Sequence, residues 1–380
     1  MGPLVARIVA WTAVVAATLA CAIEVLGALP APTLPLLAFA VAVPEVASRA
    51  LVICVVLLVA IGLLARGRLR VVGVSLASIA CVLALVPLVQ YPQARIAADA
   101  ELRAFDATAQ PGPALARPAA IRVTANVPVH TRDGATLGFD VYHAPTAGPR
   151  PTIVTIYGGA WLFGKRQDMA EIDRDLAAHG YTVIAIDYRH APKHRFPVER
   201  DDVQDALATI AHNAERFDVD PDRVAIFGRS AGAELALLAG YAPSLLHVRG
   251  VVAYYAPTDL VDGYNVPPRP DPADVRGILR AYLGTPPNGN ASGYRAASPI
   301  EHVRAGLPPT FLIIGDRDLL VRPEQQRALR DALRAHHDRV VAIELPWSNH
   351  AFDALPGGLG GTLARRETLR FLAATLRTSS

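Results

Sequence analysis

The sequence is short of cysteine and of net charge, and each shortage excludes a class of protein. Its 380 residues include three cysteines, Cys21, Cys54 and Cys81, and none follows position 81. The larger, C-terminal part of the chain therefore has no disulfide framework and no thiolate metal site, so its core alone must hold it together. The 37 basic residues nearly balance the 34 acidic ones, leaving a net charge of +3, and no nucleic-acid partner is expected.

Charged residues are also scarce in three long stretches near the N-terminus, residues 4–29, 50–65 and 71–90. A membrane-spanning helix needs about 20 apolar residues. The first and third stretches meet that length, and the second does so if it begins near Pro44 and places Arg49 at a membrane interface. The sequence therefore predicts a lipid bilayer as a partner and three transmembrane helices, at about 4–29, 44–65 and 71–90.

The orientation of these helices follows from their basic residues. Arg7 precedes the first helix, while Arg66, Arg68 and Arg70 crowd the turn before the third, and basic residues in short loops stay on the cytoplasmic side. Three spans then predict a multi-pass protein of the cell membrane whose remaining chain lies outside the cytoplasm. A cleaved signal peptide is the alternative for the first stretch. The proline-punctuated residues 33–43 are expected to be re-entrant or to lie at the surface, and a fourth span there would reverse the orientation.

A short connecting region follows the third apolar stretch. Residues 93–108 predict an amphipathic juxtamembrane helix with Ile96, Leu102 and Phe105 as its apolar face, and the Pro- and Ala-rich residues 110–118 predict a linker. The predicted organisation is a transmembrane region at 1–90, a juxtamembrane helix and linker at 91–118, and a globular domain at 119–380.

In the globular domain, short β-rich runs alternate with helical patterns. Such buried strands separated by helices predict a mostly parallel sheet with helices on both faces. Residues 257–299, rich in Pro and Gly with a single predicted helix at 272–283, interrupt the alternation, and we interpret them as a cap insertion, with a disordered loop as the alternative. The predicted strands are 121–129, 137–142, 152–157, 182–186, 224–227, 251–255, 310–314 and 340–345. The predicted helices are 169–179, 198–213, 323–336 and 359–376.

A candidate nucleophile lies between one of these strands and a helical pattern. Residues 228–232 read Gly-Arg-Ser-Ala-Gly, a G-x-S-x-G sequence that begins directly after the strand at 224–227. A strand, a tight turn carrying a serine, and a helix form the context of a nucleophile elbow, in which the glycines allow close packing. The pattern predicts that the Ser230 hydroxyl is exposed at the carboxyl end of the sheet.

A serine nucleophile needs a base, and the base needs an acid that fixes its tautomer. His350 follows the last predicted strand, which places it at the same edge of the sheet, whereas His190 and His194 are weaker candidates. Asp316 and Asp318 follow the strand at 310–314. We predict Asp318 as the acid, with Asp316 as the alternative, which gives the chain order Ser, Asp, His.

An oxyanion hole requires backbone N–H groups close to the nucleophile. Tyr157-Gly158-Gly159-Ala160-Trp161 follows the strand that begins at Thr152, and its glycines let the backbone approach a substrate. We predict the N–H groups of Gly158, Gly159 and Ala231 as the donors.

These motifs together resemble the hormone-sensitive-lipase-like and acetyl-esterase branch of the α/β-hydrolases, over about residues 121–376. The resemblance also rests on Asp187-Tyr188-Arg189-His190-Ala191-Pro192, Gly315-Asp316-Arg317-Asp318 and Asn349-His350-Ala351-Phe352. It implies the α/β-hydrolase fold, carboxylesterase activity and Asp318 as the acid. The chain departs from the family where Tyr157 replaces a histidine that braces the oxyanion loop, and where Arg229 replaces a frequent aspartate. A tyrosine hydroxyl is expected to brace the loop in a similar way.

The sequence therefore predicts a membrane-anchored serine carboxylesterase or lipase-like hydrolase, working through Ser230, Asp318 and His350 without a metal or organic cofactor. Its expected substrates are small-molecule or lipid esters with short- to medium-length acyl chains. One alternative is an amidase, formamidase or acyltransferase that uses the same triad. Another is a catalytically inactive membrane receptor or scaffold with a hydrolase-like domain.

Overall fold

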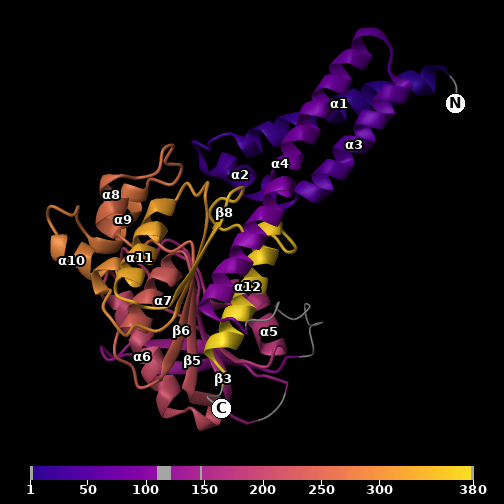
Figure 1. The fold of residues 1–380 in the computed structure, drawn as a ribbon. Coiled ribbons are helices and arrows are strands. Elements are labelled where there is room, and N and C mark those ends of the chain that lie inside the picture. The colour runs from indigo at the N-terminus through magenta and orange to yellow at the C-terminus, as the bar shows by residue number, and fades with distance from the viewer. Residues whose placement is uncertain (1–2, 109–120, 146–147, 378–380) are drawn as a thin grey trace.

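A bundle of long helices projects from an α/β domain in the computed structural model of the chain (Figure 1). The structure describes residues 3–108, 121–145 and 148–377. The linker predicted at 110–118 lies outside these residues.

The N-terminal region contains four helices, and three of them are long and apolar enough to cross a membrane. Helices α1, α3 and α4 meet these criteria, while α2 is short. Small side chains line the contacts between the long helices, including Ala13 of α1 and Ala77 of α4, and small residues let helix backbones approach closely in lipid. The prediction of three long apolar helices is confirmed. The bounds are α1 Pro3–Ala28, α2 Leu34–Glu45, α3 Ala47–Leu64 and α4 Gly67–Phe105.

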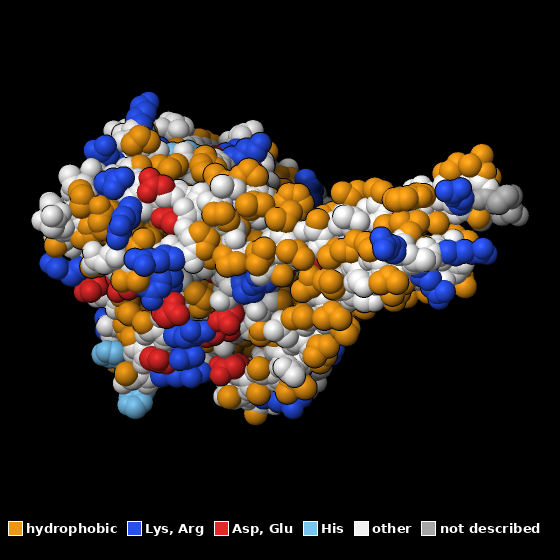
Figure 2. Space-filling view, turned by 90° about the horizontal axis from the view of Figure 1, so that it is seen from above, with side chains coloured by type: hydrophobic (Ala, Val, Ile, Leu, Met, Phe, Trp, Pro, Cys, Tyr) orange, Lys and Arg blue, Asp and Glu red, His pale blue; other side chains and the backbone are white. Residues whose placement is uncertain are grey.

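Two groups of basic residues in this bundle lie at the end that is remote from the α/β domain, whereas Arg49 of α3 lies at the opposite end, near Gly357. The N-terminus and the α3–α4 turn are neighbours at that end, and Figure 2 shows basic side chains at the tip of an otherwise largely apolar bundle. Arg7 belongs to the start of α1, and Arg66, Arg68 and Arg70 belong to the turn and the start of α4. The structure thus gathers the two basic groups at one end, as the orientation argument requires.

Helix α4 differs from its prediction, because it continues without interruption from the bundle into the α/β domain. It is 39 residues long and merges the predicted third span with the predicted juxtamembrane helix. Its predicted apolar face is wrong at Ile96, which is 69% exposed, whereas Ala94, Ala98 and Leu102 are buried in the main core. Small alanine side chains let the helix approach the domain closely. The buried face of α4 is therefore recognised by its small residues and not by a row of large apolar ones.

The domain is built on one eight-stranded sheet with the order β1-β2-β4-β3-β5-β6-β7-β8. Strand β2 is antiparallel to β1 and β4, and all the other neighbours are parallel. The predicted sheet of eight strands is therefore confirmed. The bounds are β1 Val123–His130, β2 Thr136–Tyr142, β3 Arg150–Ile156, β4 Thr182–Ile186, β5 Val219–Arg229, β6 Val248–Tyr254, β7 Thr310–Gly315 and β8 Val340–Leu345.

Helices cover both faces of this sheet (Figure 1). Helices α5 and α12 lie on one face with the end of α4, while α6, α7 and α11 lie on the other. An ion pair of Arg365 with Asp175 joins α12 to α5. The bounds are α5 Ala170–Ala178, α6 Val198–His212, α7 Ala231–Tyr241, α11 Pro323–Ala335 and α12 Leu359–Thr375, and short 3₁₀ helices occupy Arg166–Met169, Glu215–Phe217 and Pro299–His302.

The predicted cap insertion contains three helices where the sequence predicts one. They are α8 Leu260–Asn265, α9 Val275–Leu283 and α10 Ala291–Ala296. The side chains of Asp259, Asp274 and Asn290 each accept a hydrogen bond from the backbone N–H three residues later. Such N-caps satisfy otherwise unpaired donors, which lets helices form even in a segment rich in proline and glycine.

Helix α2 occupies the proline-punctuated stretch that was expected to be re-entrant or superficial. Leu37 and Ala40 of α2 pack against Leu319 and Leu320, which follow β7 in the α/β domain. The N-terminal region thus touches the loops at the carboxyl end of the sheet.

The buried face of α4 generates the first prediction. Replacing Leu102, which is fully buried, by alanine is expected to lower the free energy of unfolding by about 2–5 kcal/mol, because it leaves a cavity in the main core. The matched change Ile96→Ala, at an exposed site of the same helix, is expected to alter it by less than about 0.5 kcal/mol. Thermal unfolding of both variants in detergent measures the difference, and equal effects would contradict the observed orientation of α4.

Candidate active site

The nucleophile candidate Ser230 lies in a strained turn between β5 and α7. Its backbone has φ 50° and ψ −122°, a sparsely populated conformation for a residue with a side chain. A methyl group on Gly228 would place its carbon 2.1 Å from the carbonyl oxygen of Gly232, and one on Gly232 would lie 2.2 Å from that of Tyr157. Both positions therefore require glycine, because the turn packs its own backbone against that of the neighbouring strand.

Three loops at the carboxyl edge of the sheet bring the predicted triad side chains together. The Nε2 atom of His350 lies 2.9 Å from Oγ of Ser230, and its Nδ1 atom lies 2.8 Å from Oδ2 of Asp318. Ser230 follows β5, Asp318 follows β7 and His350 follows β8. The imidazole is thus within hydrogen-bonding distance of a hydroxyl on one side and of a carboxylate that can fix its tautomer on the other.

The two aspartates after β7 have different surroundings. The Oδ1 atom of Asp318 accepts hydrogen bonds of 2.8 Å from the backbone N–H groups of Leu320 and Val321, which leaves Oδ2 to face His350. Asp316, the alternative acid, instead pairs with Arg327 at 2.7 Å. The structure therefore brings Asp318, and not Asp316, to His350.

The predicted oxyanion loop lies directly against the nucleophile. A methyl group on Gly158 would lie 2.9 Å from the carbonyl oxygen of Arg229 and 3.1 Å from Cβ of Ser230. Gly159, Ala160 and Trp161 all have positive φ angles of 138°, 53° and 60°. Such a run of unfavourable backbone conformations persists only where the surroundings hold it in place. The loop is therefore a constrained element beside Ser230.

One support of this loop is Tyr157, which replaces the histidine that the resemblance leads one to expect. Its hydroxyl donates to the backbone carbonyl of Tyr188 at 3.2 Å and lies 2.9 Å from Nε2 of His190. The rings of Tyr157 and Tyr188 stack with centroids 4.5 Å apart. Burial raises the pKa of Tyr157 and lowers the pKa of His190, which favours the neutral form of both groups.

The loop is also held by contacts of Trp161 that the sequence did not predict. The indole Nε1 of Trp161 donates to Oε2 of Glu234 at 3.0 Å, and the indole stacks on the ring of Tyr282 with centroids 4.2 Å apart. Glu234 is fully buried one turn after Ser230, and burial raises its pKa well above the usual range. The pattern Ser-x-x-x-Glu marks one face of α7, but nothing local in the sequence indicates its partner.

An apolar pocket opens beside Ser230, under the cap. Its volume is about 70 Å³, so it is narrow, and it is lined from the oxyanion loop, α8, α9 and the segment after Asp318. Its lining residues include Ala160, Trp161, Leu260, Val275, Ile278, Leu279, Leu320 and Val321. Such a pocket suits a hydrocarbon group attached to a carbonyl at Ser230.

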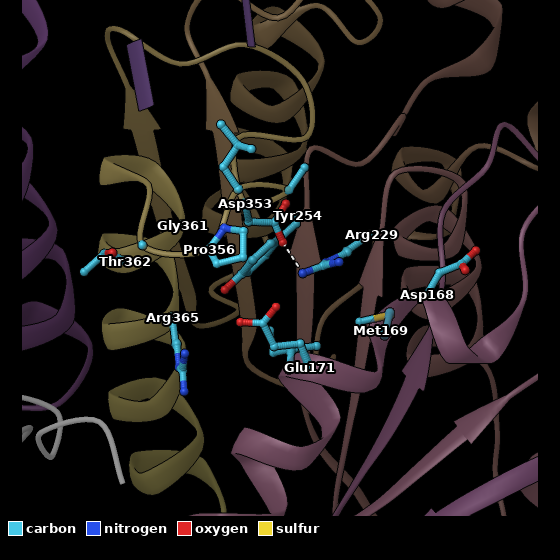
Figure 3. A pocket seen from close by; sticks show the side chains of 14 residues that line it. Asp168, Met169, Glu171, Arg229, Tyr254, Asp353, Pro356, Gly361, Thr362 and Arg365 are labelled. Carbon is cyan, nitrogen blue, oxygen red and sulfur yellow. Dashed lines mark ion pairs between the residues drawn. The ribbon is translucent and has the colours of Figure 1, made fainter. Parts of the chain in front are cut away.

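A second, polar cavity of about 310 Å³ lies between α5 and α12 and contains the side chain that precedes the nucleophile (Figure 3). In it, Arg229 forms an ion pair with Asp353, which also accepts a hydrogen bond of 2.6 Å from the hydroxyl of Tyr255. The ring of Tyr255 lies against His350, with centroids 4.5 Å apart. Arg229 thus anchors the loop after His350, a role that the sequence did not reveal.

Among residues 3–108, 121–145 and 148–377, no group of three or more His, Cys, Asp or Glu side chains is arranged to hold a metal ion. The groups gathered at Ser230 are a hydroxyl, an imidazole, a carboxylate and backbone amides. This set can perform acyl transfer through a serine ester.

The BD-FAE family profile matches residues 139–333, just over half of the chain. The esterase LipC of Mycobacterium tuberculosis is 35% identical over 231 residues, which cover 57% of this chain and 56% of LipC. Esterase LipQ of the same organism is 31% identical over 231 residues, which cover 56% of this chain and 54% of LipQ. The chain spans about half the length of the curated relatives it matches.

Solved structures share the fold of the α/β domain. The carboxylesterase EstE1, from a metagenomic library, matches with a TM-score of 0.60 at 23% identity, covering 76% of this chain and 98% of EstE1. An esterase from Pyrobaculum calidifontis matches with a TM-score of 0.57 at 24% identity, covering 76% of this chain and 92% of that one. With the eight-stranded sheet, the serine turn and the family match in agreement, the chain belongs to the BD-FAE family and its C-terminal domain has the α/β-hydrolase fold.

Proposed function

We propose that this protein is a membrane-anchored serine carboxylesterase, and that Ser230, His350 and Asp318 form its catalytic triad. The observation that carries the proposal is the relay of 2.9 Å and 2.8 Å contacts through His350, set beside a glycine-rich loop and an apolar pocket. The esterase names of the relatives support hydrolysis of carboxylic esters.

The proposed reaction begins when Nε2 of His350 takes the proton of Ser230 as Oγ attacks the ester carbonyl. The developing oxyanion is stabilised by the N–H groups of Gly158, Gly159 and Ala231, and Asp318 stabilises the imidazolium. Nε2 then returns the proton to the leaving alkoxide, and the alcohol departs. A water molecule, deprotonated by the same histidine, attacks the acyl-enzyme, releases the carboxylic acid and restores the Ser230 hydroxyl.

The pocket supports a substrate with a short to medium acyl chain. Its apolar lining favours hydrocarbon, and its volume of about 70 Å³ leaves little room for a bulky acid group. The cap helices α8 and α9 supply several of the lining residues, so the cap sets the acyl preference.

The membrane placement rests on the N-terminal bundle. Helices α1, α3 and α4 are long and apolar enough to span a bilayer, and four basic residues gather at the end remote from the catalytic domain, against Arg49 alone near the other end of α3. Because basic residues of short loops stay in the cytoplasm, this arrangement supports a catalytic domain outside it.

The triad has a direct test with an activity-based probe. In the full-length protein, Ser230→Ala is expected to abolish labelling by a fluorophosphonate and to lower kcat for p-nitrophenyl esters about 10⁶-fold, and Asp318→Asn about 10⁴-fold. Asp316→Asn is the matched control and is expected to keep near-wild-type activity, because that carboxylate faces Arg327. Equal labelling of the wild type and Ser230→Ala would falsify the enzyme proposal.

Tyr157→Phe tests the proposed brace of the oxyanion loop. Removing the hydroxyl deletes its contacts with Tyr188 and His190, and we expect kcat to fall about 10-fold with little change in KM, less than the roughly 10²-fold cost of losing an oxyanion donor. Tyr294→Phe is the control, since that buried cap hydroxyl has no hydrogen-bond partner among the described residues. An unchanged kcat in Tyr157→Phe would show that ring packing alone holds the loop.

Orientation is tested by labelling with a membrane-impermeant maleimide. A cysteine introduced at Leu245, an exposed site of the α/β domain, is expected to react on intact cells, whereas one at Arg68 should react only after permeabilisation. The unmodified chain, whose cysteines lie within the apolar helices, provides the background. The reverse pattern would place the catalytic domain in the cytoplasm.

A further inference from the structure

A carboxylate from the N-terminal region is buried behind the catalytic histidine. Glu45 is the last residue of α2 and is only 2% exposed. Its Oε1 atom accepts a hydrogen bond of 2.6 Å from the hydroxyl of Ser348, and its Oε2 atom accepts one of 2.5 Å from the backbone N–H of Gly360. Both partners belong to the α/β domain, about 300 positions away in the chain.

The α/β domain is shaped to admit this side chain. A methyl group on Gly360 would lie 2.9 Å from Oε1 of Glu45 and 2.8 Å from Oγ of Ser348, and one on Gly358 would lie 3.0 Å from Oε2. These glycines lie at the start of α12, where unpaired backbone N–H groups and the helix dipole favour a carboxylate.

Ser348 connects this carboxylate to the catalytic loops. Its carbonyl oxygen accepts a hydrogen bond of 3.1 Å from the N–H of Arg317, next to Asp318. The following residue, Asn349, uses its Oδ1 atom to accept from the N–H groups of both His350, at 2.8 Å, and Leu319, at 3.0 Å. The turn that carries His350 and the turn that carries Asp318 are therefore hydrogen-bonded to each other through residues 348–349. Glu45 accepts a hydrogen bond from the first of these residues, Ser348.

Other contacts from the N-terminal helices reach the same turns. The ring of Tyr91, on α4, lies 5.8 Å from that of Trp347, and the guanidinium of Arg317 donates to the carbonyl oxygen of Ala28, at the end of α1. With α2 packed on Leu319, three of the N-terminal helices touch the segments that carry His350 and Asp318.

We propose that Glu45 is a positioning residue for His350, so that the N-terminal helices form part of the catalytic unit and do not serve only as an anchor. This inference rests on the esterase function proposed above. The carboxylate fixes Ser348, which holds the His350 loop at the distance at which Nε2 reaches Ser230. Misplacement of a catalytic group by about 1 Å can lower a rate about 10²-fold.

The surroundings of Glu45 explain why a carboxylate is needed. The pKa of Glu45 is raised to about 7, chiefly by burial and also by nearby Asp353, although the hydrogen bonds from Ser348 and Gly360 act to lower it. The side chain of Trp347 also acts to lower the pKa of Glu45. The cationic side chain of Arg49 lies nearby, close to Gly357 in the loop before α12. An ionised carboxylate accepts from both partners through its two oxygens, whereas an amide in its place accepts at only one oxygen and has to turn its NH₂ group toward the Ser348 hydroxyl, which must then accept. The amide also has no charge to interact with the start of α12.

Kinetics of the full-length protein in detergent test the proposal. We expect Glu45→Gln and Ser348→Ala to lower kcat about 10-fold or more, and to slow fluorophosphonate labelling of Ser230 in proportion, because both need a correctly placed His350. KM for a short p-nitrophenyl ester should stay within about 2-fold, since Glu45 does not line the apolar pocket. The matched control is Glu101→Gln, which breaks an exposed ion pair between α4 and Arg334 of α11 and should leave kcat unchanged.

The readouts separate the inference from its alternatives. If Glu45→Gln keeps the wild-type kcat per labelled serine while its Tm falls, the carboxylate is only a structural joint and the proposal is overturned. If Glu45→Gln does not fold, Ser348→Ala carries the same test, because it removes one hydrogen bond and little volume. If the wild type itself shows no Ser230-dependent activity, the proposed esterase function fails, and this inference fails with it.

Discussion

The contact between Ser230 and His350 is the constraint on which the rest of the structure depends. A hydroxyl and an imidazole must meet at 2.9 Å although they lie on loops that follow β5 and β8, which have two other strands, β6 and β7, between them in the sheet. The parallel sheet brings the strand ends to one edge, but it does not fix side chains to fractions of an ångström. That precision comes from the loops, and each loop is tied by buried polar contacts.

Each of those contacts takes a polar group out of water and satisfies it with specific hydrogen-bond or ion-pair partners. Tyr157 is held by Tyr188 and His190, Trp161 is held by Glu234, and the loop after His350 is held by Arg229 through Asp353. A buried polar group that loses its partner is costly, so these side chains have few alternative positions. Strained backbone at Ser230 and Ala160 is tolerated in such surroundings.

The sequence predicted the parts of this site that local pattern determines. Ser230, Asp318 and His350 each follow an apolar strand, so their positions at one edge follow from the strand order. Two of the three cap helices, α8 and α10, were missed although Asp259 and Asn290 are ordinary N-cap residues, because proline and glycine dominated the pattern. Glu45 and Glu234 could not be assigned, because their partners lie far away in the chain and a single sequence does not show which distant residues meet. The alanine face of α4 was missed because close packing favours small residues, while periodicity highlights large ones.

The continuity of α4 fixes how the N-terminal helices are held relative to the α/β domain. A flexible linker would let a catalytic domain turn freely relative to its anchor, but α4 enters the domain as one helix whose end is buried against β8 and α12. Asp99 of α4 pairs with Arg366 and Arg370 of α12, so the junction is fixed by charge as well as by packing. If the bundle spans a bilayer as proposed, the catalytic domain has one orientation at the membrane surface. The triad loops then lie on the bundle side of the sheet, since α2 and the end of α1 touch them directly, and the same contacts that orient the domain also steady its histidine.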